Sequence, residues 1–154
     1  MSDAYPVARE EGGDGLRIGI AAARFNEELV HPLLERVEAV LKAAGAEVRA
    51  IRVPGSLELP YAAMKLAESE RFDALVVLGV VIAGDTRHHE HIADATGYGI
   101  QKVSLEKGIP IVNGILVTET REQAEARTTG SVDKGGHFGQ AALELAHLNR
   151  NPSF

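Results

Sequence analysis

The feature that most restricts the fold of this chain is an uninterrupted apolar run from Ala74 to Ile82, which overlaps a strand expected at residues 73–81. A strand with one face in water alternates apolar and polar side chains, whereas a strand covered on both faces is apolar throughout. Residues 27–44 carry leucines and valines at helical spacing, so helices are available to cover such a strand. The pattern predicts a parallel sheet with helices on both faces.

The rest of the chain continues this alternation of strands and helices. Strands are expected at residues 17–22, 47–53, 73–81 and 109–116, and helices at 27–44, 57–69, 89–106, 121–127 and 136–148. Gly45 and Gly108 are candidate helix stops, and Ser56 is a candidate N-cap. The predicted fold class is α/β: a single-domain flavodoxin-like three-layer sandwich with a central parallel sheet of four to five strands.

Length and composition restrict the class of protein further. The 154 residues suit one domain, which we place at residues 16–148 between a flexible N-terminal tail, 1–15, and a C-terminal tail, 149–154. A net charge of −6 argues against a nucleic-acid partner, and the lack of cysteine excludes disulfides, thiolate metal sites and a cysteine nucleophile. Neither a secretory signal nor a membrane span is recognisable, so a cytoplasmic protein without membrane contact is expected.

The unusual side chains gather where the predicted strands end. Ligands of such sheets bind outside the carboxyl ends of the strands. The candidate residues are Phe25 and Asn26 after the first strand, Ser56, Leu57 and Glu58 after the second, the segment Gly84-Asp85-Thr86-Arg87-His88-His89-Glu90-His91 after the third, and Asn113-Gly114 after the fourth. All four loops are expected at one edge of the sheet.

The histidine-rich segment allows three interpretations. It could be a solvated helix start, or a metal site in which His88 and His91 share a helix face while His89 points elsewhere. One helix cannot complete a coordination sphere, and no further ligands are evident. The third interpretation is general acid–base chemistry by one histidine beside an anion held at the helix N-terminus. Asp85 would repel a phosphate there unless its side chain points away.

The remaining candidates are also open to two interpretations each. Phe25 could be a core aromatic followed by an N-cap at Asn26, or it could stack on a planar ligand. Glu58 could simply favour the helix start, or it could hold hydroxyls of a polyol. Arg127 and Lys134 could be surface cations, or they could complete a phosphate site.

Taken together, these segments resemble a known family. From about Leu16 to Leu148 the chain is similar to 6,7-dimethyl-8-ribityllumazine synthase. The similarity is carried, in order, by the segments FN, PGSLELP, GVVIAGDTRHHEHI, PIVNGIL, EQAEAR and KGG. The resemblance implies the penultimate step of riboflavin biosynthesis. In that reaction 5-amino-6-(D-ribitylamino)uracil condenses with 3,4-dihydroxy-2-butanone 4-phosphate, releasing phosphate and water, with no metal or organic cofactor.

The resemblance also implies roles for individual residues. His88 would be the catalytic proton-transfer residue, which leaves His89 and His91 as bystanders. Ribitylaminouracil would bind to Phe25, Asn26, Ser56, Leu57, Glu58, Asn113 and the backbone of Val80, Val81 and Ile82. The butanone phosphate would bind to Gly84, Asp85 and Thr86, with Arg127 and Lys134 supplied by a neighbouring subunit.

The family builds pentamers with active sites between subunits, often assembled into icosahedral shells, and riboflavin synthase is a further expected partner. Departures from the family pattern are Ala83, Val117 and the loop at residues 128–135. That loop lacks the insertion of pentamer-only forms, which favours a larger assembly. Two alternatives stay open: an archaeal-type riboflavin synthase, which the GDTRH segment and the long tail disfavour, and a non-catalytic flavin- or lumazine-binding shell protein, which the altered loop permits.

Overall fold

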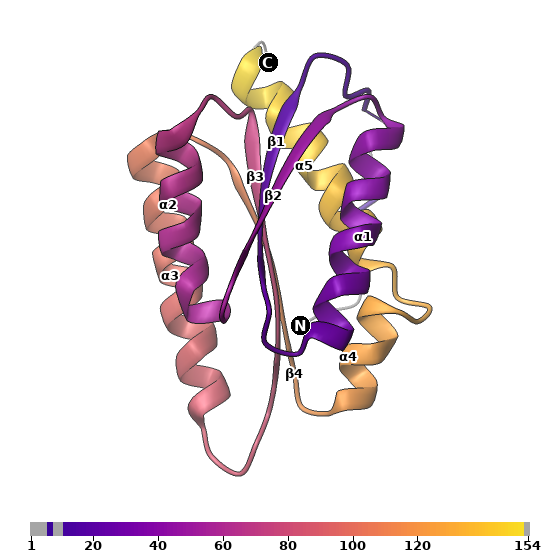
Figure 1. Ribbon diagram of the computed structural model, residues 1–154, viewed down its shortest axis with the longest axis vertical. Helices are drawn as coiled ribbons and strands as arrows, with labels where there is room; N and C mark the ends of the chain where they lie inside the picture. Colours follow the sequence, from indigo (N-terminus) through magenta and orange to yellow (C-terminus); the bar gives the residue numbers. More distant parts are fainter. Residues whose placement is uncertain (1–5, 8–10, 153–154) are drawn as a thin grey trace.

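The computed structural model describes residues 6–7 and 11–152 and has three layers (Figure 1). The central sheet contains β1 (Arg17–Ala23), β2 (Glu47–Val53), β3 (Ala74–Ile82) and β4 (Ile111–Thr118). All paired strands are parallel, in the order β2-β1-β3-β4. This is the flavodoxin-like arrangement, in which the carboxyl ends of the strands share one edge. The predicted fold class is confirmed.

Helices cover both faces of the sheet. Figure 1 shows α1 (Glu27–Ala43), α4 (Arg121–Thr128) and α5 (Lys134–Arg150) on one face, and α2 (Leu59–Ser69) and α3 (His88–Lys107) on the other. Each face has its own apolar core: Val76 packs with the first group and Val77 with the second. The apolar run of β3 is buried on both faces, which explains why it lacks alternation.

The glycines proposed as helix stops are confirmed. α1 ends just before Gly45 and α3 ends just before Gly108, and both glycines have positive φ, +96° and +63°. A left-handed residue reverses the chain at a helix end, and glycine adopts that conformation without a steric penalty. Local chemistry therefore placed these two boundaries correctly.

The boundaries of the fourth strand were predicted wrongly. β4 begins two residues later than expected and stays paired with β3 up to Thr118. Asn113 pairs with Val77 within the strand, which agrees with the expected strand range 109–116, and the separate expectation that Asn113-Gly114 follows the strand is wrong. A Cβ at Gly114 would lie 2.6 Å from Leu78 Cδ2 and 2.7 Å from the Val77 carbonyl oxygen. The glycine reflects close packing within the sheet rather than a turn.

Residues within both expected tails contact the domain. α5 continues two residues beyond its expected end at Leu148, because Asn149 Nδ2 donates to Asp73 O over 3.0 Å and Arg150 pairs with the Asp73 carboxylate at 3.2 Å. Near the N-terminus, Gly13 N donates to Ala44 O over 2.8 Å. The remaining expected tail residues, 1–5, 8–10 and 153–154, lie outside the described residues. None of the helices described is long and apolar enough to cross a membrane.

Candidate active site

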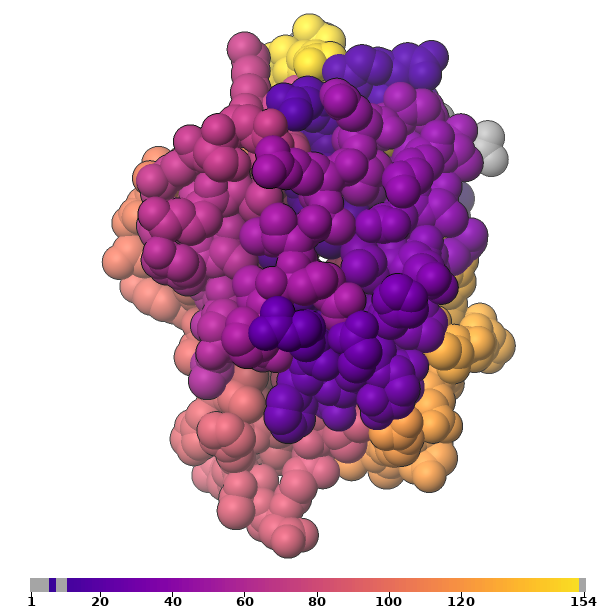
Figure 2. All heavy atoms as spheres, in the orientation of Figure 1, coloured from indigo at the N-terminus to yellow at the C-terminus, as the bar shows by residue number. Residues whose placement is uncertain are grey.

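An open pocket of about 420 Å³ lies at the carboxyl edge of the sheet, where the turn after β1, the turn after β2 and the end of β3 with the start of α3 meet. The loop between β3 and α3 projects from this end of the molecule (Figures 1 and 2). The pocket is lined by Phe25, Asn26, Gly55, Ser56, Leu57, Glu58, Val80, Val81, Ile82, Gly84, Thr86, His88, His89 and Ile92.

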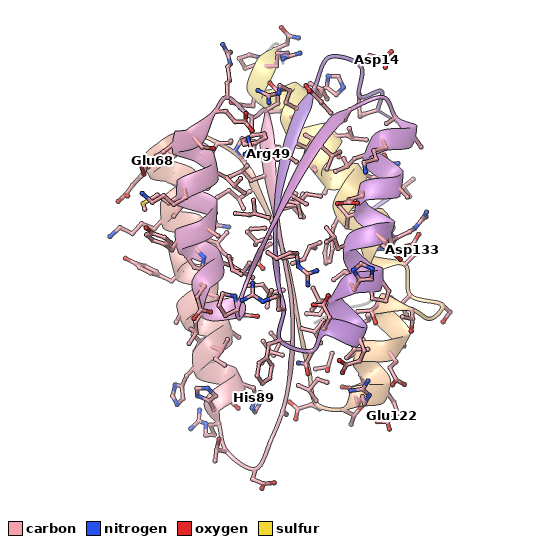
Figure 3. The ribbon with its side chains drawn as sticks, viewed as in Figure 1. Asp14, Arg49, Glu68, His89, Glu122 and Asp133 are labelled. Atoms are coloured by element: carbon pink, nitrogen blue, oxygen red, sulfur yellow. The ribbon has the colours of Figure 1, made fainter. Side chains whose placement is uncertain are left out.

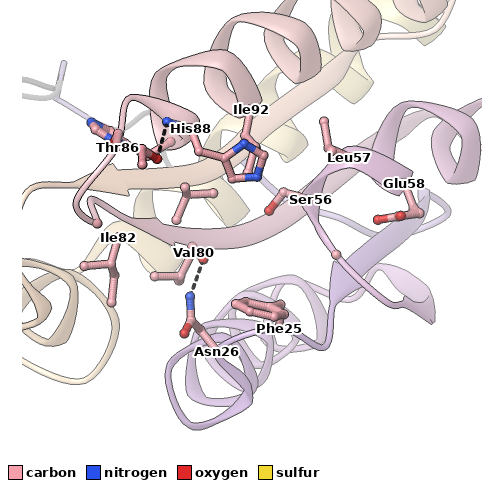
Figure 4. A pocket seen from close by; sticks show the side chains of 14 residues that line it. Phe25, Asn26, Ser56, Leu57, Glu58, Val80, Ile82, Thr86, His88 and Ile92 are labelled. Atoms are coloured by element: carbon pink, nitrogen blue, oxygen red, sulfur yellow. Dashed lines mark hydrogen bonds between the residues drawn. The ribbon is translucent and has the colours of Figure 1, made fainter.

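The first wall is the short turn between β1 and α1. Phe25 is 71% exposed, so its ring belongs to the pocket and not to the core. Asn26 has left-handed backbone angles, φ 58° and ψ 46°, and its side-chain amide donates to Val80 O over 2.7 Å (Figure 4). Asn26 occupies the N-cap position of α1, but its side chain makes no cap hydrogen bond. The side chain fastens the turn to the end of β3.

The second wall is the segment that follows Pro54. Ser56, Leu57 and Glu58 form a single 3-10 turn, η1 (Ser56–Glu58), before α2. The predicted N-cap at Ser56 is wrong, because α2 is capped at Glu58 without a side-chain hydrogen bond. Ser56 is instead buried against β3, and a Cβ at Gly79 would lie 2.5 Å from its hydroxyl oxygen. Glycine at position 79 lets the serine approach the strand.

The third wall is the start of α3. The helix begins at His88, one residue earlier than expected, and Thr86 Oγ1 accepts a hydrogen bond from His88 N at 3.3 Å. The exposed His88 ring lies across the pocket from the Phe25 ring, with Ser56 between them (Figure 4). An imidazole that is open to solvent and faces an aromatic platform can exchange protons with a ligand stacked on that platform.

His89 also lines the pocket, although the family resemblance implied no role for this residue. Its side chain is only 11% exposed, and Nδ1 lies 3.2 Å from Thr86 O. Nε2 lies 3.9 Å from Glu90 Oε1 and 4.0 Å from Glu119 Oε1. No sequence pattern indicated that both His88 and His89 line the pocket, because helical periodicity separates neighbours by about 100°.

Four predicted site residues do not line this pocket: Asp85, Asn113, Arg127 and Lys134. Asp85 is exposed in the projecting loop, and Asn113 is exposed on β4. Arg127 is on α4, where Nη1 donates to Gln123 O over 2.8 Å, and Lys134 is only 2% exposed at the start of α5. The pocket lining, all of it within the described part of the chain, includes no arginine or lysine.

The metal interpretation finds no geometric support among the described residues. Nowhere in that part of the chain do three or more His, Asp or Glu side chains converge as metal ligands would. The arrangement instead combines an aromatic platform, a buried hydroxyl, a glycine-containing loop and two imidazoles. Such a site can bind a planar ring and move protons beside it.

Comparison with known proteins gives the family. A family-wide sequence model described as 6,7-dimethyl-8-ribityllumazine synthase matches residues 15–150. The chain belongs to the 6,7-dimethyl-8-ribityllumazine synthase family. It is 48% identical to the synthase of Cupriavidus necator over 139 residues, which cover 88% of this chain and 82% of the relative. It is 47% identical to that of Ralstonia nicotianae over 147 residues, which cover 94% of this chain and 87% of the relative. It is also 47% identical to the synthase of Paraburkholderia phytofirmans over 140 residues, which cover 88% of this chain and 81% of the relative.

The lumazine synthase match spans the whole sheet and every wall of the pocket. The resemblance inferred from the motifs is therefore confirmed. The match supports neither the archaeal-type riboflavin synthase nor the non-catalytic shell protein, because the relatives are named for the lumazine-forming reaction.

Proposed function

We propose that this chain condenses 5-amino-6-(D-ribitylamino)uracil with 3,4-dihydroxy-2-butanone 4-phosphate to give 6,7-dimethyl-8-ribityllumazine, phosphate and water. The observation that carries the proposal is the meeting of three separate segments in one pocket. Phe25-Asn26, Ser56-Leu57-Glu58 and Thr86-His88 are far apart in the sequence, and the sheet gathers them. The pocket has the aromatic surface, polar rim and imidazole that this reaction needs.

The pyrimidine half of the reaction fits the walls formed by the first two turns. The exposed Phe25 ring offers a flat surface on which a uracil ring stacks. Asn26, whose amide is already bound to Val80 O, borders that surface. Ser56, Leu57 and Glu58 bind the ribityl hydroxyls, and backbone groups of residues 80–82 bind the ring edge. Stacking on Phe25 provides binding affinity for the pyrimidine, while the polar groups fix the orientation of its ring in the pocket.

The chemistry consists of bond changes that require repeated proton movement. The 5-amino nitrogen attacks the ketone carbon, and loss of one water leaves an imine. A proton leaves the carbon beside the imine, and phosphate departs from the next carbon with its bonding electron pair. This elimination leaves an enol, which takes up a proton at its terminal carbon and loses its hydroxyl proton to become a ketone. The ribityl-bearing nitrogen then attacks that ketone carbon, and loss of a second water closes the ring. His88, which faces the stacked ring, transfers these protons.

The phosphate half is shared between subunits in this proposal. Gly84, Asp85 and Thr86 bind the phosphate from the loop before α3, through backbone groups in the case of the exposed Asp85. Since no arginine or lysine of the described chain lines its own pocket, Arg127 of a neighbouring subunit, near that subunit's Asn113, completes the charge balance. Lys134 of that subunit is the weaker candidate, because its side chain is almost fully buried within its own chain. The functional unit is then a pentamer, with larger shells built from it, and riboflavin synthase is the partner that uses the product.

One assay tests the reaction directly. Purified protein is supplied with both substrates while lumazine absorbance and phosphate release are followed together. Both signals are expected to rise in equal amounts, because one phosphate leaves for each ring that closes. A rate no higher than the uncatalysed background would overturn the proposal.

A second assay tests the sharing of the site between subunits. His88→Ala and Arg127→Ala variants are unfolded, mixed in equal amounts and reassembled. If the two residues act from different subunits, about a quarter of the interfaces regain both native side chains, and activity rises above that of either variant alone. Activity that never exceeds the average of the two parents would place Arg127 outside the neighbour's site. Mass measurement of the native assembly distinguishes a pentamer from a larger shell.

A further inference from the structure

The turn that carries Phe25 is held by its backbone rather than by packing of the ring. Arg24 N donates to Val53 O at 2.8 Å and Phe25 N donates to Pro54 O at 3.0 Å, while Asn26 adopts positive φ. The ring itself is 71% exposed. Any change in the backbone of this turn would therefore be transmitted to the ring position without resistance from neighbouring side chains.

Arg52, on β2 opposite Ala22, makes bonds on both sides of this turn. Its Nε donates to Ala22 O at 3.2 Å and its Nη2 donates to Ala23 O at 3.0 Å, the last two carbonyls of β1. Its Nη1 donates to Glu27 Oε1 at 3.1 Å, at the first residue of α1. One guanidinium thus fixes the separation between the end of β1 and the start of α1.

This task suits arginine in particular. A planar guanidinium presents five N–H donors in a fixed fork, whereas a lysine ammonium is a single point of charge. The Arg52 side chain is 26% exposed and Glu27 is about half exposed, so the ion pair by itself adds little stability. Its value lies in geometry, since acceptor atoms of three residues in two elements, including both carboxylate oxygens of Glu27, converge on one rigid group.

We infer that Arg52 is a positioning residue for Phe25: through Ala22 O, Ala23 O and Glu27 it sets the turn that aims the aromatic ring into the pocket. The inference rests on the proposed function for the ligand that Phe25 receives. The expected contribution to ribitylaminouracil binding is indirect, because Arg52 is absent from the residues that line the pocket. It does not extend to the phosphate loop, which belongs to β3 and α3.

The first test needs no substrate. The chain has no tryptophan, so Phe25→Trp introduces a unique fluorescent reporter at the ring position. In that background, Arg52→Met is expected to lower the fluorescence anisotropy and raise quenching by acrylamide, with Arg52→Lys and Glu27→Gln giving smaller changes. The matched control is Arg49→Met, on the same strand. Arg49 pairs with Glu70 at 2.8 Å and lies far from His89, toward the other end of the sheet (Figure 3). Unchanged fluorescence in the Arg52→Met variant, or an equal change in the Arg49→Met control, would overturn the inference.

The second test measures ligand affinity with the native phenylalanine in place. Arg52→Met is expected to weaken ribitylaminouracil binding by about threefold to tenfold, as for the loss of one or two hydrogen bonds, while inorganic phosphate binds as before. Equal loss of both ligands would indicate general disruption and contradict a positioning role. If Arg52→Met fails to fold, Glu27→Gln gives the same comparison. Failure of the unaltered protein to bind the pyrimidine would reject the proposed function, while the fluorescence test would still decide the role of Arg52.

Discussion

Asn26 donates its side-chain amide to the main-chain oxygen of Val80 across 2.7 Å, and so ties the turn after β1 to the end of β3. The same residue holds the chain's one described non-glycine positive φ, 58°. A left-handed conformation costs roughly 1–2 kcal/mol for most residues, and asparagine tolerates it better than they do. Asn26 therefore makes a hydrogen bond between two walls of the pocket and also adopts a left-handed backbone conformation that asparagine tolerates.

Replacing Asn26 by alanine and by glycine should separate these two contributions. We expect Asn26→Ala to lower the free energy of unfolding by about 2 kcal/mol, from the lost hydrogen bond and the left-handed backbone together. Asn26→Gly should cost about 1 kcal/mol less, because glycine accepts positive φ. Urea unfolding of both variants measures the difference. Equal losses would mean that backbone strain contributes nothing at this position.

Phe25→Ala should affect binding far more than stability. The ring is mostly exposed, so its removal uncovers little core, and thermal unfolding should change only slightly. Loss of stacking on a pyrimidine should weaken ribitylaminouracil binding by about 1–3 kcal/mol, by analogy with bases stacked on aromatic side chains. Calorimetric titration gives the affinity. Phe25→Tyr, which keeps the ring, is the control and should bind nearly as well as the native protein.

His88→Ala should lower kcat and leave ribitylaminouracil affinity almost unchanged. A positioned proton-transfer group typically contributes about 10²–10⁴-fold in rate. His91→Ala is the matched control, because His91 is exposed on the same helix but does not line the pocket. Steady-state kinetics of both variants provide the comparison. Native kcat in the His88→Ala protein would transfer proton movement to another group, and His89 would be the next candidate.

Gly79→Ala should disturb the second wall of the pocket. The new methyl group would meet the Ser56 hydroxyl at 2.5 Å, and overpacking of this kind costs about 1–3 kcal/mol. The double variant Gly79→Ala with Ser56→Ala removes that oxygen and should recover much of the loss. Unfolding free energies of the two single variants and the double variant form a double-mutant cycle. Additive losses would show that Ser56 is not the obstacle.

Asp133 should make stability depend on pH in the acidic range. The Arg36 guanidinium, at 3.0 Å from Oδ1 and 2.7 Å from Oδ2, lowers the pKa of Asp133 below its ordinary value of 3.8, with help from the Gly136 N–H. The folded state thus favours the carboxylate, so this contribution is complete well above pH 3.8 and is lost as the pH falls through the folded pKa. Asp133→Asn keeps a capping side chain and removes the charge. Its thermal midpoint should differ from that of the native protein more at pH 7 than at pH 3, and a constant difference would contradict this assignment.

Local chemistry in the sequence was sufficient for most of the fold. The apolar run from Ala74 to Ile82 indicated a strand buried on both faces, and the glycines at 45 and 108 marked two helix ends. Both signals depend on residues that are close together in the chain, and for that reason they predicted the strand and the two helix ends correctly. The strand-end segments FN, PGSLE and GDTRH also carried enough pattern to indicate one edge of the sheet and the family, which comparison with known proteins then confirmed.

Only the tertiary structure decided contacts between distant segments. The sequence suggested a helix cap at Ser56, whereas the structure places that hydroxyl against Gly79 of β3. It suggested that Asn113 follows a strand, whereas pairing with Val77 places it in mid-strand. The sequence resemblance implied no role for His89, whereas the structure places it in the pocket lining. No sequence pattern indicated that Arg52 would bridge β1 and α1. Register and side-chain direction arise from long-range packing, and such contacts leave no periodic trace in the order of the residues.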